Sequence, residues 1–142
     1  MLDNLPLGAH LISPRRGYLH HGVYAGSGRV IHYGGFNRIF SSRPVEEVSL
    51  DEFSLGRGLA VKAWVAPTFM GENAVSRARS RIGENRYRLF SNNCEHFAEW
   101  CIGGKARSLQ VDGLKATMKK RLARFVRPRR VGDTGSGPLA AA

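Results

Sequence analysis

Residues 19–33 read LHHGVYAGSGRVIHY and predict two antiparallel strands joined by a glycine turn. β-branched and aromatic residues on both sides of the turn favour strands, and Gly26-Ser27-Gly28 is typical of a hairpin turn. A three-residue turn places His20 on the same sheet face as His32. A two-residue turn shifts the register and places His21 there instead. The residues alone leave both registers open.

Around this hairpin the sequence predicts a small antiparallel sheet packed on helices. Short stretches of strand-forming residues alternate with helical spacing and with glycine-rich turns, which indicates the α+β class. The further predicted strands are 8–13, 45–48, 59–65 and 86–90, and the predicted helices are 49–53, 72–82 and about 94–102.

Cys94 is expected at the first position of the last of these helices. Asn92 or Asn93 before it is a good N-cap. The helix dipole and the free backbone N–H groups there favour the thiolate, which is the nucleophilic form of cysteine. One hairpin histidine would take the thiol proton and the other would orient the first, while backbone N–H groups stabilise an oxyanion. The pattern therefore indicates covalent catalysis.

Three segments resemble the lecithin:retinol acyltransferase family. Residues 20–26, His-His-Gly-Val-Tyr-Ala-Gly, are similar to the family's His-x-x-(Ile/Val)-Tyr-x-Gly, and His32 follows His20 at the family's spacing of twelve residues. The third segment is Asn93-Cys94-Glu95-His96-Phe97, followed by residues 106–111. The likeness covers roughly residues 5–112, and the histidines precede the cysteine, as they do in that family's circularly permuted papain-like fold.

The resemblance implies a role for each matching residue. Cys94 would be the nucleophile, His20 the general base and His32 the third polar residue, which favours the three-residue turn. The implied enzyme is a thiol-dependent acyltransferase or acyl hydrolase of lipid metabolism that acts through an acyl-cysteine, without a cofactor. The chain departs from the family at Gly8-Ala9, where Gly-Asp is frequent. It also lacks the membrane-spanning helix with which animal members often end, so the substrate does not transfer.

The other histidines and the second cysteine are predicted to be structural. His21 is expected on the opposite sheet face, exposed or supporting the site, and His96 lies about 200° around the helix from Cys94. Cys101 is expected in the core, about 10 Å along the helix from Cys94 and too far for a disulfide. A zinc site built from His20, His32, Cys94 and His96 matches no common ligand spacing, so no metal is expected.

Charge divides the chain of 142 residues, whose net charge is +11, into three predicted parts. Residues 1–112 hold 14 basic and 10 acidic side chains and form the predicted catalytic domain. Residues 113–131 hold eight basic side chains and no acidic one, which predicts a basic amphipathic tail. Residues 132–142 are rich in Gly, Ser, Pro and Ala and are predicted to be disordered.

The tail suggests a partner. An apolar stripe with basic neighbours in residues 114–130 would dock on an anionic membrane surface, while a solvated charge run is the plainer alternative. No specific nucleic acid is expected, because no recognisable module accompanies the charge. No stretch approaches the ~18 apolar residues of a spanning helix, and the N-terminus lacks a secretory pattern. The sequence therefore predicts a cytoplasmic protein, with peripheral membrane binding as the tail's contribution.

Two alternatives compete with an acyl-lipid enzyme. A cysteine peptidase or amidase of the same wider superfamily would use the same residues on a peptide bond, in an open polar groove and not in an apolar slot. A non-enzymatic membrane- or anion-binding module would form no covalent intermediate.

Overall fold

The computed structural model describes residues 4–38, 41–89 and 91–106. These residues belong to one compact unit, Met1–Leu109. The predicted basic tail 113–131 and the segment 132–142 lie outside the described residues. In the part that is described, no helix has the length and apolar character needed to cross a membrane.

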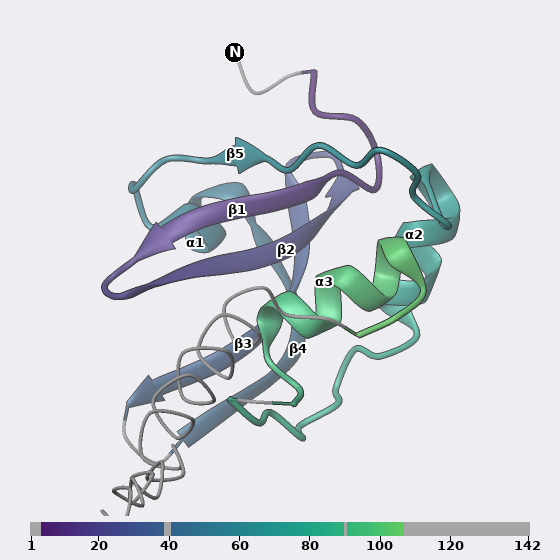
Figure 1. Ribbon diagram of the computed structural model, residues 1–142. Helices are drawn as coiled ribbons and strands as arrows, with labels where there is room; N and C mark the ends of the chain where they lie inside the picture. The colour runs from purple at the N-terminus through teal and green to yellow at the C-terminus, as the bar shows by residue number, and fades with distance from the viewer. Residues whose placement is uncertain (1–3, 39–40, 90, 107–142) are drawn as a thin grey trace, which may run out of the picture. The chain divides into compact units, whose positions relative to one another are not determined.

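One antiparallel sheet forms the centre of the fold, with the strand order β4-β3-β2-β1-β5 (Figure 1). Its strands are β1 (His10–Arg15), β2 (Tyr18–Gly26), β3 (Arg29–Arg38), β4 (Ser41–Ser49) and β5 (Ala60–Val61). The helices are α1 (Leu50–Ser54), α2 (Gly71–Arg79) and α3 (Cys94–Gly103). The α+β class predicted from the sequence is confirmed, and the permuted relation to papain stays a prediction.

The β2–β3 hairpin adopts the register that a three-residue turn requires. Gly22 pairs with His32 and Val23 with Ile31. The tip combines a two-residue turn, with positive φ at Ser27 (50°) and Gly28 (69°), with a bulge next to it in β2. The bulge adds the extra residue, so the face shared by His20 and His32 was predicted correctly.

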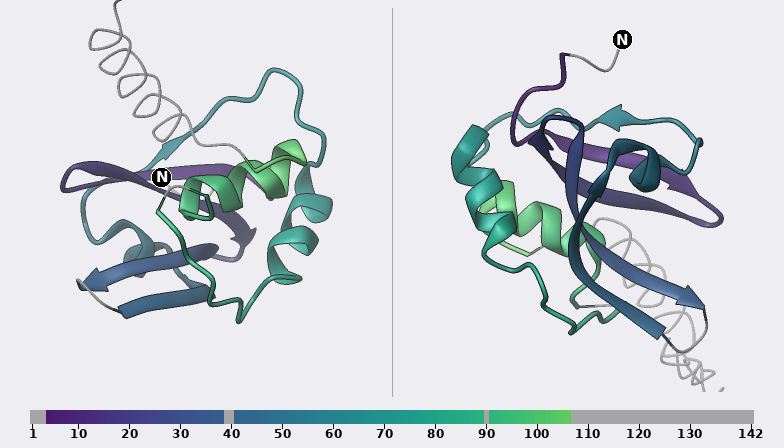
Figure 2. Two further views of the ribbon diagram at one scale, coloured as in Figure 1. Left: turned by 60° about the horizontal axis from the view of Figure 1, so that its bottom comes forward. Right: turned by 180° about the vertical axis from the view of Figure 1, so that it is seen from behind.

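Hydrophobic side chains cover both faces of the sheet. On one face, Val23 and Tyr33 pack against α2 and α3, where Phe97 is fully buried. On the other face, Phe53 of α1 packs against Val30. The two views in Figure 2 show α1 and α3 on opposite sides of β2. Burying both faces makes β2 a central strand whose side chains alternate between two packed layers.

Two predicted strands form only in part or not at all. Of residues 59–65, only Ala60–Val61 pair with β1. Residues 86–90 were predicted as a strand, but the described part, 86–89, makes only an isolated bridge, in which the backbones of Arg88 and Asn92 bond to each other. Strand propensity is a local property, whereas a strand also needs a neighbour with free hydrogen-bonding groups.

Candidate active site

Two histidines of the hairpin meet on the α1 face of the sheet. His20 Nε2 lies 2.6 Å from His32 Nδ1, and His32 Nε2 lies 3.3 Å from an oxygen of Glu46. Both rings contact Phe53. Glu46 comes from β4, where it is the ladder partner of His32, and it also pairs with Arg43 at 2.8 Å. The hairpin register and the β3–β4 register together build this chain of three polar groups.

The carboxylate of Glu46 determines where the ring protons lie. A carboxylate only accepts hydrogen bonds, so His32 Nε2 carries a proton and His32 Nδ1 is an acceptor. His20 Nε2 then donates to His32 Nδ1, and the proton of neutral His20 is accounted for. His20 Nδ1 is therefore a lone-pair nitrogen, which is the form that a general base requires.

Cys94 begins α3, as predicted. The side chain of Asn93 accepts a hydrogen bond from the N–H of His96, and the His96 ring accepts from the N–H of Asn93, which closes a capping box. His96 thus caps the helix, in line with the structural role predicted for it. At the other end Gly104 adopts the left-handed conformation that ends the helix.

The Cys94 thiol lies at a vacant ladder position of β2. Its Sγ is 3.9 Å from the carbonyl oxygen of Leu19 and accepts from the N–H of His21. The N–H and C=O of Tyr24 both bond to the segment that leads into β1. The backbone N–H and C=O groups of the odd-numbered residues of β2 therefore point toward β3. The β2–β3 pairing ends at His32, and β3 continues beside β4. The thiol therefore occupies a place at β2 that a β3 residue would otherwise fill.

The thiol therefore lies beside the backbone of His20, because it contacts Leu19 and His21, the residues on either side of His20 in β2. The ring of His20 points to the α1 face, whereas Cys94 packs in the core on the α3 face. Within the described residues, the thiol proton is directed to the Leu19 carbonyl and not to an imidazole nitrogen. Tyr87, which the sequence analysis did not single out, hydrogen-bonds Cys94 through its side chain, and burial raises the Tyr87 pKa.

Cys94, His20 and His32 are uncharged at rest, which corrects the expectation of a thiolate. The Cys94 side chain is 3 % exposed, and this burial raises its pKa to about 11, although backbone N–H groups of His21, Glu95 and Cys94 act in the opposite direction. Burial also lowers the pKa of His32 to about 4, although the Glu46 carboxylate acts to raise it. Burial holds the pKa of His20 well below its usual range. Depth of burial outweighs the helix N-terminus here.

The remaining predicted residues are buried. His21 lies on the opposite face from His20, as expected, but is only 3 % exposed and bonds to His10. Cys101 is a fully buried free thiol of the core, and Cys94 is free as well. Nowhere in residues 4–38, 41–89 and 91–106 do three His, Cys, Asp or Glu side chains converge as metal ligands.

Sequence reasoning missed Glu46, Tyr87 and the partners of His21. Glu46 lies in a stretch that was predicted as a strand, yet nothing in that stretch pairs it with His32. The alternation of β3 and β4 would have placed Glu46 beside His32 only after the strand register was known.

A thiol at a helix start that contacts the strand carrying a histidine–histidine–carboxylate chain is the set of groups that thiol–imidazole sites use. Residues 3–107 match the family model described as lecithin retinol acyltransferase. The human protein named lecithin retinol acyltransferase is 25 % identical over 133 residues, which cover 75 % of this chain and 58 % of that protein. The Bos taurus protein of the same name is 25 % identical over 126 residues, which cover 70 % of this chain and 55 % of that protein.

The chain belongs to the lecithin retinol acyltransferase family. It spans somewhat more than half the length of the curated relatives that it matches.

Proposed function

We propose that the protein is a thiol-dependent acyltransferase or acyl hydrolase that acts on an ester or amide of a lipid through an acyl-cysteine. The observation that carries this proposal is the Glu46–His32–His20 chain, which leaves a lone pair on His20 Nδ1 in the same strand whose backbone the Cys94 thiol contacts at Leu19. Membership of the family supports an acyl-transfer reaction.

The reaction proceeds in two halves. Cys94 Sγ attacks the acyl carbonyl while its proton passes to His20 Nδ1, because neither group is charged at rest. The N–H groups at the start of α3 and the Tyr87 hydroxyl are the candidate donors to the oxyanion. The tetrahedral intermediate expels the alcohol or amine, which takes the proton from His20, and a Cys94 thioester remains. Water or an acceptor then attacks the thioester while His20 takes its proton. The C–S bond breaks, the acyl product leaves, and the Cys94 sulfur takes the proton back from His20.

Glu46 and His32 stabilise the imidazolium that forms in each half. His20 gains a positive charge when it takes the thiol proton, and His32 accepts from its Nε2–H. The Glu46 carboxylate polarises His32 in the same direction. Arg43 pairs with the same Glu46 oxygen that faces His32. The negative charge of Glu46 therefore stabilises His20 more in its protonated form than in its neutral form.

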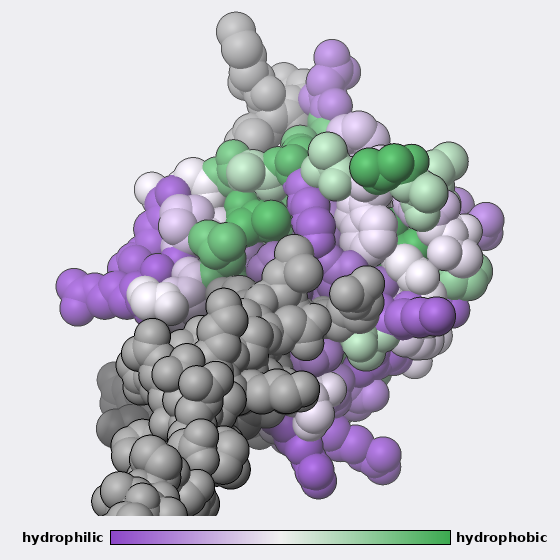
Figure 3. All heavy atoms as spheres, viewed as in Figure 1, coloured by the Kyte–Doolittle hydropathy of each residue, from purple (hydrophilic) through white to green (hydrophobic). Residues whose placement is uncertain are grey.

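Exposed apolar side chains favour an acyl chain over a polar peptide. Leu19, whose carbonyl faces the thiol, is 43 % exposed, and Tyr18 next to it is 45 % exposed. Figure 3 shows hydrophobic side chains gathered over β5 and the neighbouring strand β1. The exposed side chain of Leu19, whose carbonyl the thiol faces, suits a lipid substrate.

Intact-mass spectrometry tests the nucleophile directly. After incubation with a short-chain phospholipid, the wild-type protein should gain the mass of one acyl group, and Cys94→Ala should gain none. Cys101→Ala is the matched control, because that thiol lies buried in the same helix, and it should behave like the wild type. An adduct on Cys94→Ala, or no adduct with any acyl ester or amide, contradicts the proposal. An adduct from an acyl-peptide alone favours the amidase alternative.

Glu46→Gln tests the orienting carboxylate. Glutamine keeps an oxygen that accepts from His32 but removes the charge, so kcat/KM should fall about tenfold, the difference between a charge-assisted and a neutral hydrogen bond. Glu47→Gln is the matched control, because Glu47 pairs with Arg29 at 3.7 Å and its side chain lies on the opposite face of β4 from that of Glu46. Equal activity of the two variants would remove Glu46 from the mechanism.

A further inference from the structure

A second histidine pair lies on the opposite face of β2. His21 Nδ1 is 2.7 Å from His10 Nε2, and Trp64 Nε1 is 3.2 Å from His10 Nδ1. His10 is 1 % and His21 3 % exposed. The acyl-transfer steps above use neither of them. Buried polar side chains that are joined in one network are usually retained for specificity of structure or function.

The indole of Trp64 determines the protons of this second chain. An indole N–H only donates, so His10 Nδ1 is an acceptor and the proton of neutral His10 lies on Nε2. His10 Nε2 donates to His21 Nδ1, and the proton of neutral His21 therefore lies on its own Nε2. Through these hydrogen bonds, Glu46 and Trp64 place the ring proton of both His20 and His21 on Nε2, but the two rings differ in which nitrogen is already bonded to a neighbouring histidine. His20 keeps a lone pair at Nδ1, and His21 presents an N–H.

The second chain also reaches the nucleophile through the backbone. The N–H of His21 bonds to Cys94 Sγ, and this contact is the largest of those that favour the thiolate. The His21 ring is fixed by His10, so rotation of this residue, which would move its N–H away from the sulfur, is opposed. Loss of the His10–His21 ring contact should therefore weaken the hydrogen bond from the His21 backbone N–H to Cys94 Sγ.

We propose that Trp64, His10 and His21 form a positioning relay, a chain of hydrogen bonds that holds the His21 N–H on the Cys94 sulfur and excludes His21 as the general base. The role in turnover rests on the proposed acyl chemistry, whereas the hydrogen-bond pattern does not. His21 is thereby a positioning residue, since its ring acts on the thiol through the backbone.

The charged groups around the relay come from α3 and from the segment after β5. Glu95 favours the protonated form of both imidazoles, and Lys62 opposes it. Lys62 pairs with Glu99 and lies over the Trp64 ring. Burial outweighs these charges and lowers the pKa to about 3 for His10 and to about 4 for His21. Both imidazoles are therefore neutral near pH 7, as the proton assignment requires.

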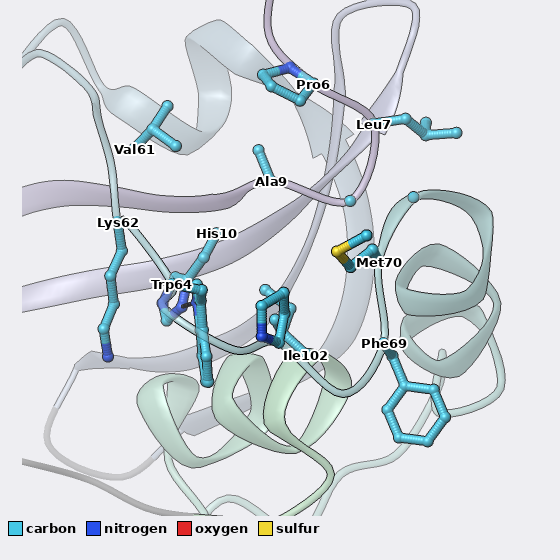
Figure 4. A pocket seen from close by; sticks show the side chains of 13 residues that line it. Pro6, Leu7, Ala9, His10, Val61, Lys62, Trp64, Phe69, Met70 and Ile102 are labelled. Atoms are coloured by element: carbon cyan, nitrogen blue, oxygen red, sulfur yellow. Dashed lines mark hydrogen bonds between the residues drawn. The ribbon is translucent and has the colours of Figure 1, made fainter.

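The outer end of the relay borders an open pocket of about 160 Å³. Figure 4 shows His10 and Trp64 side by side at its wall, with Lys62 next to them and Ile102 across from them. Space beside the indole makes Trp64→Phe a mild change, since the variant removes the N–H donor without adding volume. His21, by contrast, is enclosed, so its replacements are chosen by shape.

Two replacements of His21 separate hydrogen bonding from packing. The amide oxygen of asparagine lies close to the position of Nδ1 and accepts from His10, whereas leucine offers no acceptor. In a Cys101→Ala background, we expect His21→Leu to slow alkylation of Cys94 by iodoacetamide about five- to tenfold and to lower kcat without changing KM. His21→Asn should stay within about threefold of the parent. Equal rates for the two variants, or faster alkylation in His21→Leu, overturn the proposal.

Nitrogen NMR of the wild-type protein tests the proton assignment without any substituted histidine. With ¹⁵N-labelled histidine, His10 and His21 should both carry the proton on Nε2 and stay neutral down to pH 5. In Trp64→Phe, His10 Nδ1 loses its donor, so the His10 proton should no longer be confined to Nε2. A proton on His21 Nδ1, or titration of either ring near pH 6.5, overturns the relay. Neither NMR nor alkylation needs a substrate, so failure of the relay is distinct from failure to form an acyl-enzyme.

Discussion

The free energy of unfolding should fall by several kcal/mol when the pH is lowered from 7 to 5. Burial holds the pKa of His10 at about 3 and of His21 and His32 at about 4, and that of His20 well below its usual range. An unfolded histidine has a pKa of about 6.5, so near pH 5 the unfolded chain binds protons that the folded protein does not bind. Stability is therefore complete above about pH 6.5 and is lost as the pH falls toward 4.

The expected size follows from the number of imidazoles. At pH 5 each of the three imidazoles whose pKa is about 3 to 4, those of His10, His21 and His32, costs about 2 kcal/mol, so together they cost about 6 kcal/mol, a large share of a typical domain's stability. His20 adds to the loss in the same direction. Urea unfolding followed by circular dichroism at pH 7, 6 and 5 measures the loss. In His10→Gln, the loss of unfolding free energy between pH 7 and pH 5 should be smaller by about 2 kcal/mol, the contribution of one imidazole. Equal urea midpoints at pH 7 and pH 5 would show that the buried histidines are not the source of acid sensitivity.

His20→Ala should lower kcat/KM about a thousandfold. A positioned general base typically contributes 10²- to 10⁴-fold, and removal of His20 leaves the neutral Cys94 thiol without an acceptor for its proton. Added imidazole should restore part of the activity, because it can enter the space that the ring leaves beside Phe53. His21→Ala provides the comparison on the same strand and should lose about tenfold, because it removes a positioning contact only.

The order of these two losses decides between the neighbouring histidines. Single-turnover acylation with a fluorogenic ester measures both variants without product release. A larger loss in His21→Ala than in His20→Ala would reverse the assignment of the base and, with it, the proton arrangement argued from Glu46 and Trp64.

Local signals in the sequence predicted the parts of the fold that depend on local geometry. The turn glycines and strand-forming residues of 19–33 led to the hairpin, and Asn93 before Cys94 led to the start of α3. The failures were the predicted strands 59–65 and 86–90, which had the right residue types for a strand. What they lacked was a partner along most of their length, and this depends on the path of distant segments.

The candidate site divides along the same line. His20, His32 and Cys94 lie in motifs that can be read along the chain, and the first two do meet. Glu46 and Trp64 have no motif, and their importance arises from the cross-strand register and from a loop that returns to β1. The thiolate was predicted wrongly because a helix start is visible in the sequence, whereas the depth of burial is a property of the assembled core.

The place of the Cys94 sulfur also has a consequence for the strand that it adjoins. Where β3 leaves β2, an unpaired strand edge would begin, and such edges invite fraying or pairing with other chains. The thiol closes this edge by donating to the Leu19 carbonyl and accepting from the His21 N–H. An acylated sulfur has no proton to donate, so each catalytic cycle would break and re-form the hydrogen bond from Cys94 to the Leu19 carbonyl. Under the proposed acyl chemistry, the thiol proton therefore serves both this strand edge and turnover.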